Sequence, residues 1–157
     1  MTVKTKQVQG RRTVRYESLR DLLNDAEKLA TTKTHTLGNW SFGQILKHTA
    51  MSLDSSIDGT GFMLPAPVRW FMSLLMKRKF LTKPIPPGFK APDSFIPKET
   101  SIEDGLTALR AAIDRQNRET KRAPHPGFGT MSNDEWNEFH LRHAEMHMSF
   151  VVPVTDE

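Results

Sequence analysis

Residues 132–151 read SNDEWNEFHLRHAEMHMSFV, and the opening letters are the start signal of a helix. Ser132 followed by Glu135 has the spacing of a capping box, in which each side chain binds the backbone N–H of the other residue. The apolar residues that follow recur at helical spacing. We therefore predict a helix that runs from this box to about Val152 and ends at Pro153, which lacks the backbone donor needed to continue it.

Three of the chain's six histidines lie in this helix, at spacings of three and four residues. A projection at about 100° per residue places His140, His143 and His147 at the centre of the apolar half. A single buried imidazole usually finds a hydrogen-bond partner in the core, because leaving it without one costs on the order of 1–3 kcal/mol. Three on one face would compete for the few partners of a helical core. A shared divalent cation would satisfy them together.

His143 and His147 have the i, i+4 spacing of metal-chelating histidines. The letters HAEMH do not form the HExxH motif of metalloproteases, since Glu145 stands at another position and points away from the pair. Two ligands are too few for a catalytic site, which uses three and an open position. The third ligand is either His140 on the same helix or a residue of a facing helix, where His48 lies at the edge of an apolar arc.

Three further segments combine a start signal with helical periodicity. Ser41 with Gln44 and Thr100 with Glu103 have the capping-box spacing, and Ser18 is a further cap. Four capped amphipathic helices and a near absence of strand signals indicate an all-α fold, an up-and-down four-helix bundle. We predict its helices at 18–31, 41–58, 100–119 and 132–152.

A long, proline-rich connection, residues 59–99, separates the second predicted helix from the third. We expect it to be irregular, with at most one or two short helices. Its segment WFMSLLMKRKF, residues 70–80, places apolar residues beside basic ones. We expect this segment to pack over the open end of the bundle with its basic residues solvated, and contact with an anionic membrane surface is the alternative.

The chain of 157 residues is long enough for one domain with a substantial core. We divide it into a basic N-terminal arm, residues 1–15, and a single helical domain, residues 16–157. Five basic residues of the arm outnumber the formal net charge of +4, so the rest of the chain is nearly neutral. Because the chain has no cysteine, histidine or carboxylate side chains must hold any metal.

We expect a cytoplasmic protein that binds no nucleic acid and forms no stable association with a membrane. The first residues, MTVKTKQVQGRR, lack the apolar core of a signal peptide. The longest apolar run, WFMSLLM at residues 70–76, is far too short to span a bilayer. No predicted helix carries a basic stripe of the kind that follows a nucleic-acid backbone.

Three pieces of the chain, LGNWSFGQILKHTA, APHPGFGTMSNDEW and FHLRHAEMHMSFV, together resemble the DinB/YfiT-like metalloenzyme superfamily, and most closely its domain-of-unknown-function family 1569. The resemblance extends from about residue 12 to residue 152. It implies an up-and-down bundle with a long second connection. It also implies a metal held by one histidine of the second helix and an H-x-x-x-H pair of the last helix. In this sequence those residues are His48, His143 and His147, with His140 as an additional histidine one turn earlier.

The resemblance and the histidines together indicate a metal-dependent enzyme. Three imidazoles suit several divalent metals, of which we expect zinc or nickel. The superfamily includes thiol-dependent transferases and isomerases, so we expect transfer to, or isomerisation of, a small electrophilic substrate with a low-molecular-weight thiol as cofactor. The alternative is a non-catalytic helical module that binds a metal or a small ligand.

Other residues are expected near this site. We expect His140 and Trp136 to lie beside the ligands or to face a substrate pocket. Phe128, in the glycine-rich loop before the last helix, is positioned to cover that pocket. We expect a small-molecule substrate as the partner of the protein, together with a second copy of the chain in a homodimer.

Overall fold

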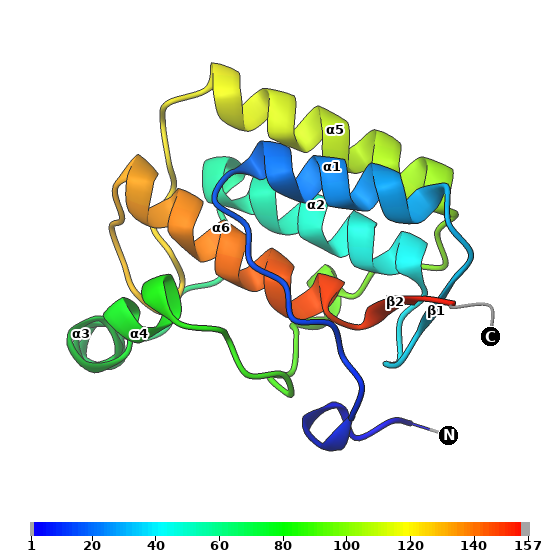
Figure 1. The fold of residues 1–157 in the computed structure, drawn as a ribbon. Coiled ribbons are helices and arrows are strands. Elements are labelled where there is room, and N and C mark those ends of the chain that lie inside the picture. Colours follow the sequence, from blue (N-terminus) through cyan, green and yellow to red (C-terminus); the bar gives the residue numbers. More distant parts are fainter. Residues whose placement is uncertain (1, 155–157) are drawn as a thin grey trace.

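Serine side chains start the four longer helices of the computed structural model, which describes residues 2–154 (Figure 1). Ser18, Ser41 and Ser132 form complete capping boxes, as predicted. The third predicted box is wrong by one position: Ser101 accepts the backbone N–H of Asp104 instead. These helices are α1 (Leu19–Ala30), α2 (Phe42–Asp58), α5 (Ile102–Arg118) and α6 (Asn133–Met148).

The other elements are short, so the described chain is mostly helical, as predicted. Two helices, α3 and α4, and the 3₁₀ turn η2 lie in the long connection between α2 and α5, which agrees with the expectation of at most one or two short helices there. No helix among residues 2–154 has the length and apolar composition needed to cross a bilayer. The short elements are η1 (Thr5–Gln7), β1 (Thr34–Thr36), α3 (Ala66–Leu75), α4 (Lys77–Thr82), η2 (Asp93–Phe95) and β2 (Val151–Pro153).

The last helix is shorter than predicted. It ends at Met148, and Val151–Pro153 form strand β2, which pairs antiparallel with β1. His35 lies opposite Val152 in this two-stranded sheet. The prediction that α6 continues to Val152 is wrong, because the end of the chain gains backbone hydrogen bonds from a segment that is more than a hundred residues away in the sequence.

Helices α2 and α5 pack closely because each has a glycine at the contact. A Cβ on Gly105 would lie 2.7 Å from the carbonyl oxygen of Gly43 and 2.9 Å from the Cβ of Leu46. A Cβ on Gly43 would collide with the carbonyl oxygen of Thr100. Small residues at a helix contact let two backbones approach closely, so this contact leaves no room for a side chain at either glycine.

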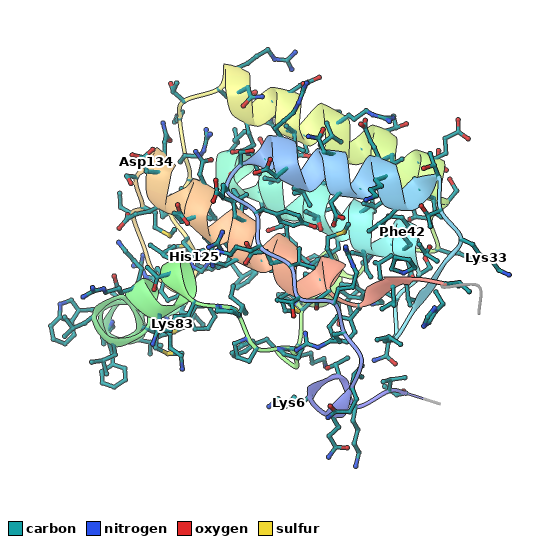
Figure 2. The ribbon with its side chains drawn as sticks, viewed as in Figure 1. Lys6, Lys33, Phe42, Lys83, His125 and Asp134 are labelled. Carbon is teal, nitrogen blue, oxygen red and sulfur yellow. The ribbon has the colours of Figure 1, made fainter. Side chains whose placement is uncertain are left out.

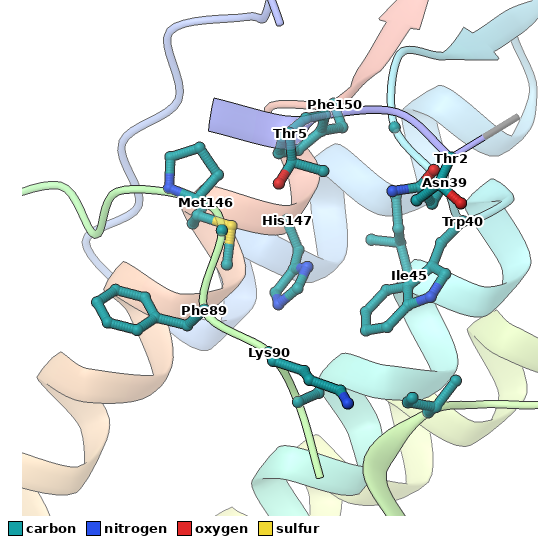
Figure 3. Close-up of a pocket in the computed structure, with 15 residues that line it drawn as sticks. Thr2, Thr5, Asn39, Trp40, Ile45, Phe89, Lys90, Met146, His147 and Phe150 are labelled. Atoms are coloured by element: carbon teal, nitrogen blue, oxygen red, sulfur yellow. The ribbon is translucent and has the colours of Figure 1, made fainter. Parts of the chain in front are cut away.

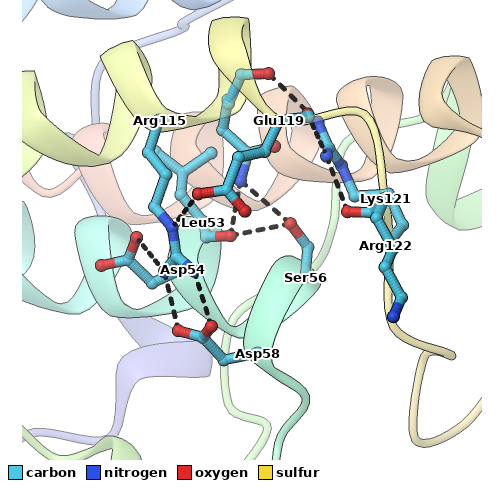
Figure 4. Close-up of polar contacts among 9 residues, drawn as sticks. Leu53, Asp54, Ser56, Asp58, Arg115, Glu119, Lys121 and Arg122 are labelled. Atoms are coloured by element: carbon cyan, nitrogen blue, oxygen red, sulfur yellow. Dashed lines mark hydrogen bonds and ion pairs between the residues drawn. The ribbon is translucent and has the colours of Figure 1, made fainter.

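The far ends of the same two helices are joined by polar contacts (Figure 4). Gln116 donates to the carbonyl oxygen of Leu53 at 2.7 Å, and Arg115 forms a two-pronged contact with Asp58. The starts of α2 and α5 meet at the glycines and their ends meet here, so the two helices run parallel. The alternation of direction expected for an up-and-down bundle is therefore wrong for this pair. The long connection brings the chain back to the end of the molecule where α2 began.

The four longer helices share one hydrophobic core. α2 contacts α5 and α6, and α1 contacts α5 and α6, so each helix has two neighbours among the other three. The most deeply buried apolar side chains of this core include Leu22, Leu46, Leu53, Leu109 and Met148. Helix α5 contributes Leu106, Leu109 and Ile113 to this core, whereas Ile102 at its start is exposed.

A second, smaller cluster forms beside the main core. Leu81, Phe128, Met131 and Trp136 are its buried members, and they join α4 and the loop before α6 to the start of α6. Lys77 of α4 forms an ion pair of 2.6 Å with a glutamate of α6, which holds the two short helices against that end of the molecule.

The N-terminal segment lies along α6. Arg12 binds the side chain of Asp25 and the backbone of Met148, and the backbone N–H of Tyr16 donates to Glu145 at 2.7 Å. Glu145 also pairs with Arg142, which is almost fully buried. This face of α6 is opposite to the one that carries His143 and His147, so the carboxylate of Glu145 points away from the histidine pair.

We expect Gly105→Ala to destabilise the protein by about 1–3 kcal/mol, the usual cost of overpacking a core. At an exposed position of a helix the same change would stabilise the protein by about 0.5–1 kcal/mol. Whether the variant is less or more stable than the wild type therefore tests whether α2 and α5 pack this closely. Denaturant unfolding measures the effect, and Thr107→Ala on the exposed side of α5 is the matched control. A Gly105→Ala variant as stable as the control would show that α2 and α5 are not in this close contact.

Candidate metal centre

Three histidines meet where α2 and α6 face each other. The Nε2 atom of His143 lies 3.3 Å from Nε2 of His48 and 3.1 Å from Nε2 of His147. One ligand atom from each ring lies within 4.8 Å of the others. The two histidines of α6 lie side by side because they are one helical turn apart, and the antiparallel approach of α2 brings the third ring opposite them.

Neighbouring groups fix the orientation of each ring. The Nδ1 atom of His48 lies 2.8 Å from the backbone carbonyl oxygen of Phe95. A carbonyl oxygen only accepts, so Nδ1 carries the proton and Nε2 presents a lone pair to the other two rings. Trp40 stacks on His147 with ring centroids 5.4 Å apart, and Phe139 stacks on His143 at 5.8 Å.

Burial keeps the three imidazoles neutral. It lowers the pKa of His48 and moves the pKa of His143 and of His147 well below the usual value of a histidine. The charge of neighbouring histidine rings lowers the last two further. Each neutral imidazole carries one N–H, and that of His48 is used at Nδ1. Nε2 of His48 therefore offers a lone pair to the other two rings, and a cation among the three nitrogens could bind one lone pair from each ring.

The donor set and its spacing fit a divalent metal ion. Metal–nitrogen bonds of about 2.0–2.1 Å in tetrahedral geometry place neighbouring ligand nitrogens about 3.3–3.4 Å apart. The observed separations of 3.3 and 3.1 Å are close to this value. The hydrogen bond from His48 to the carbonyl of Phe95 is the kind of supporting contact that metal-ligating histidines use to hold their orientation.

A cavity of about 380 Å³ opens beside the three rings. Aromatic and methionine side chains line most of it, and its lining contains no carboxylate among the described residues. Of the lysines and arginines that the structure describes, Lys90 alone belongs to this lining. The cavity therefore offers an apolar environment with the histidine nitrogens and a single ammonium group as its strongest polar features.

A second cavity, of about 390 Å³, also borders His147 (Figure 3). Thr2 and Thr5 of the N-terminal segment line it, and Asn39 holds that segment through two hydrogen bonds with the backbone of Val3. The two cavities share one wall. That wall consists of Trp40, Phe89, Lys90, Ala91, Met146 and His147.

The residues expected around the ligands occupy different positions relative to the cavity. Phe128 and Trp136 line the first cavity. His140 lies one turn before His143 and stacks on Trp136 at 5.2 Å, but it is 2% exposed and does not belong to the lining. Neither of its ring nitrogens has a hydrogen-bond partner among residues 2–154. Burial, together with the charges of Arg122 and another histidine, lowers the pKa of His140 to about 3.

The sequence reasoning missed three groups at the site. Trp40 stands in the phrase GNWS, whose position just before α2 was a usable signal. His125 lines the first cavity and stacks on Phe128 at 4.6 Å, and its Nδ1 accepts the backbone N–H of Gly127. Its position between two prolines gave no sign of this role. The carbonyl of Phe95 acts through the backbone, which has no sequence signature.

The fold and the site define a mostly helical protein with three convergent histidines beside an apolar cavity. Residues 8–154 match the family described as "Protein of unknown function (DUF1569)", and the chain belongs to that family. Comparison with curated proteins finds no match, and comparison with solved structures finds none either.

We expect His140→Phe to stabilise the metal-free protein, since an apolar ring replaces one with two unpartnered nitrogens. An unfolded histidine has a pKa near 6.5, whereas that of folded His140 is about 3. Between these values the unfolded state binds more protons, so wild-type stability falls as the pH falls, by up to about 1.4 kcal/mol per pH unit for this residue. The variant should lose correspondingly less stability.

Denaturant unfolding from pH 7 to pH 5 in the presence of a chelator measures this difference. Both proteins share all other titrating groups, so their difference isolates His140. A destabilised variant with an unchanged pH slope would show that His140 has a hydrogen-bond partner in the folded protein.

Proposed function

We propose that His48, His143 and His147 bind one divalent metal ion, zinc or nickel, and that the protein is a metal-dependent enzyme acting on a small electrophilic substrate. The observation that carries this proposal is the convergence of three uncharged imidazole nitrogens at the wall of an apolar cavity. Histidine is the commonest neutral ligand of such ions, and three ligands leave an open position for a reactant.

We also propose that the chain has the four-helix architecture of the DinB-like superfamily, with α2 and α5 parallel. The closed ring of helix contacts supports this assignment. The position of one histidine on α2 and of an H-x-x-x-H pair on α6 supports it as well, because the proposed ligands come from the elements that the resemblance implies.

A divalent ion held by these residues would supply a Lewis acid that lowers the pKa of a thiol or water bound to it. The protein's own groups favour the thiol. Within the described part of the chain, the lining of the first cavity offers no carboxylate that could act as a general base for hydrolysis. Aromatic rings and Met146 form an apolar surface that suits a soft, apolar reactant. We therefore propose that a low-molecular-weight thiol is the second reactant, in transfer to the electrophile or in its isomerisation.

Lys90 has a separate role in this proposal. It is the one lysine or arginine that lines either cavity within the described residues. Its ammonium group would bind and orient a carboxylate of the thiol or of the substrate while the rings of Trp40 and Phe89 hold the apolar part.

Metal analysis of the purified, untagged protein tests the ligand assignment. We expect about one divalent ion per chain in the wild type. His48→Ala and His147→Ala should each lower the metal affinity by more than about 100-fold, which exceeds the loss expected when a residue that only supports a ligand is removed. His140→Ala should keep its metal, and His35→Ala, an exposed position in β1, is the matched control. Full metal occupancy in His48→Ala would show that α2 supplies no ligand through this residue. A loss of metal from His140→Ala equal to that from His147→Ala would place His140 among the ligands.

Activity is tested by adding glutathione or a related thiol, with a simple electrophile, to the metal-loaded protein. We expect a faster thiol reaction with wild type than with His147→Ala or chelator-treated protein, because only the loaded site can lower the pKa of the thiol. The rate is followed by loss of free thiol. Stoichiometric metal without any acceleration would leave the non-catalytic binding module as the better description.

A further inference from the structure

Helix α3 presents its apolar side to solvent. None of its residues is buried. Five large apolar residues are exposed, and they occupy an arc of about 160° on a projection at about 100° per residue. We name this arc the outer face of α3, and it consists of Val68, Trp70, Phe71, Leu74 and Leu75, which are between 43% and 69% exposed. The expected packing against the bundle is therefore confined to the opposite side of α3, and the side with most of its large apolar residues does not take part.

The rest of the structure holds α3 in this orientation. Met72 and Met76, which lie outside the outer face, pack against the cluster that contains Leu81 and Trp136. The ion pair of Lys77 with α6 holds the adjoining helix α4. α3 and α4 project from one end of the molecule, away from the N-terminal segment and the sheet (Figure 1). The fold itself thus keeps the outer face exposed.

The segment that carries this face is cationic. Residues 59–92 contain six basic side chains and no aspartate or glutamate. Of the six, Lys77 pairs with Glu135 of α6 and Lys90 lines the cavities. The other four are Arg69, Arg78, Lys79 and Lys83, of which Lys83 lies close to α3 and α4 in the view of Figure 2. A short helix with an apolar face that includes tryptophan, flanked by lysine and arginine, has the composition of helices that lie in the plane of a membrane interface.

We propose that the outer face of α3 docks reversibly on an anionic lipid surface, with α3 parallel to that surface and the neighbouring cations on the headgroups. The charge pattern favours lipid over a second copy of this chain. A two-fold contact through the same face would bring two cationic segments together, whereas anionic headgroups complement them. The contact is peripheral, since no helix among the described residues is able to span a bilayer.

The full chain is tested by co-sedimentation with vesicles of phosphatidylcholine, with and without phosphatidylglycerol. We expect the wild type to sediment with the anionic vesicles and to be released by salt. Trp70→Ser combined with Leu74→Ser should abolish sedimentation. Arg78→Glu combined with Lys79→Glu should weaken it by at least about 25-fold, from about fivefold for each cation near the surface.

Lys28→Glu combined with Lys33→Glu is the control, because it changes the net charge equally at exposed positions near the end of α1 and should affect sedimentation less. The substituted positions are exposed, so all variants should keep the unfolding midpoint and metal content of the wild type. Equal sedimentation with neutral vesicles, or none with anionic ones, overturns the proposal. A wild-type dimer that the Trp70→Ser, Leu74→Ser variant converts to a monomer, without vesicle binding, would assign the face to a second copy of the chain.

Discussion

The close contact between Gly43 and Gly105 is the constraint on which the arrangement of the molecule depends. It fixes α2 and α5 side by side and parallel, with no space for a side chain between their backbones. Parallel neighbours require the connecting chain to return along the whole of α2, whose 17 residues extend over about 25 Å. Residues 59–101 make this return. On the way they place the carbonyl of Phe95 against His48 and the side chain of Lys90 at the wall of both cavities.

The features that could be predicted from the sequence are local ones. A serine and the acid or amide three residues later form a capping box through contacts within one turn, so Ser18, Ser41 and Ser132 were recognisable. Thr100 and Ser101 are both able to cap, and only the final structure selects the serine. The end of α6 depends on a pairing with β1, which lies far away in the sequence, and helical periodicity carries no information about that pairing.

The same division applies to the candidate site. The spacing of His143 and His147 is a property of one helix, so the pair could be recognised from periodicity. His48 comes from another helix. Its place at the edge of an apolar arc made it one candidate for the third ligand, and the family resemblance selected it over His140. The supporting carbonyl of Phe95 leaves no trace in the sequence, because any residue at that position presents the same backbone group. The exposure of the outer face of α3 was not predicted for a related reason. The apolar periodicity of one helix does not show which of its sides packs against the core.

The wall shared by the two cavities has a consequence for how reactants would arrive. His147 and Trp40 border both spaces. Two molecules, one in each space, would therefore contact the same imidazole at the same time. Neither would have to leave before the other binds, so steady-state kinetics would follow a ternary-complex scheme with intersecting reciprocal plots. An inhibitor confined to one space would compete with one reactant and leave the affinity for the other largely unchanged.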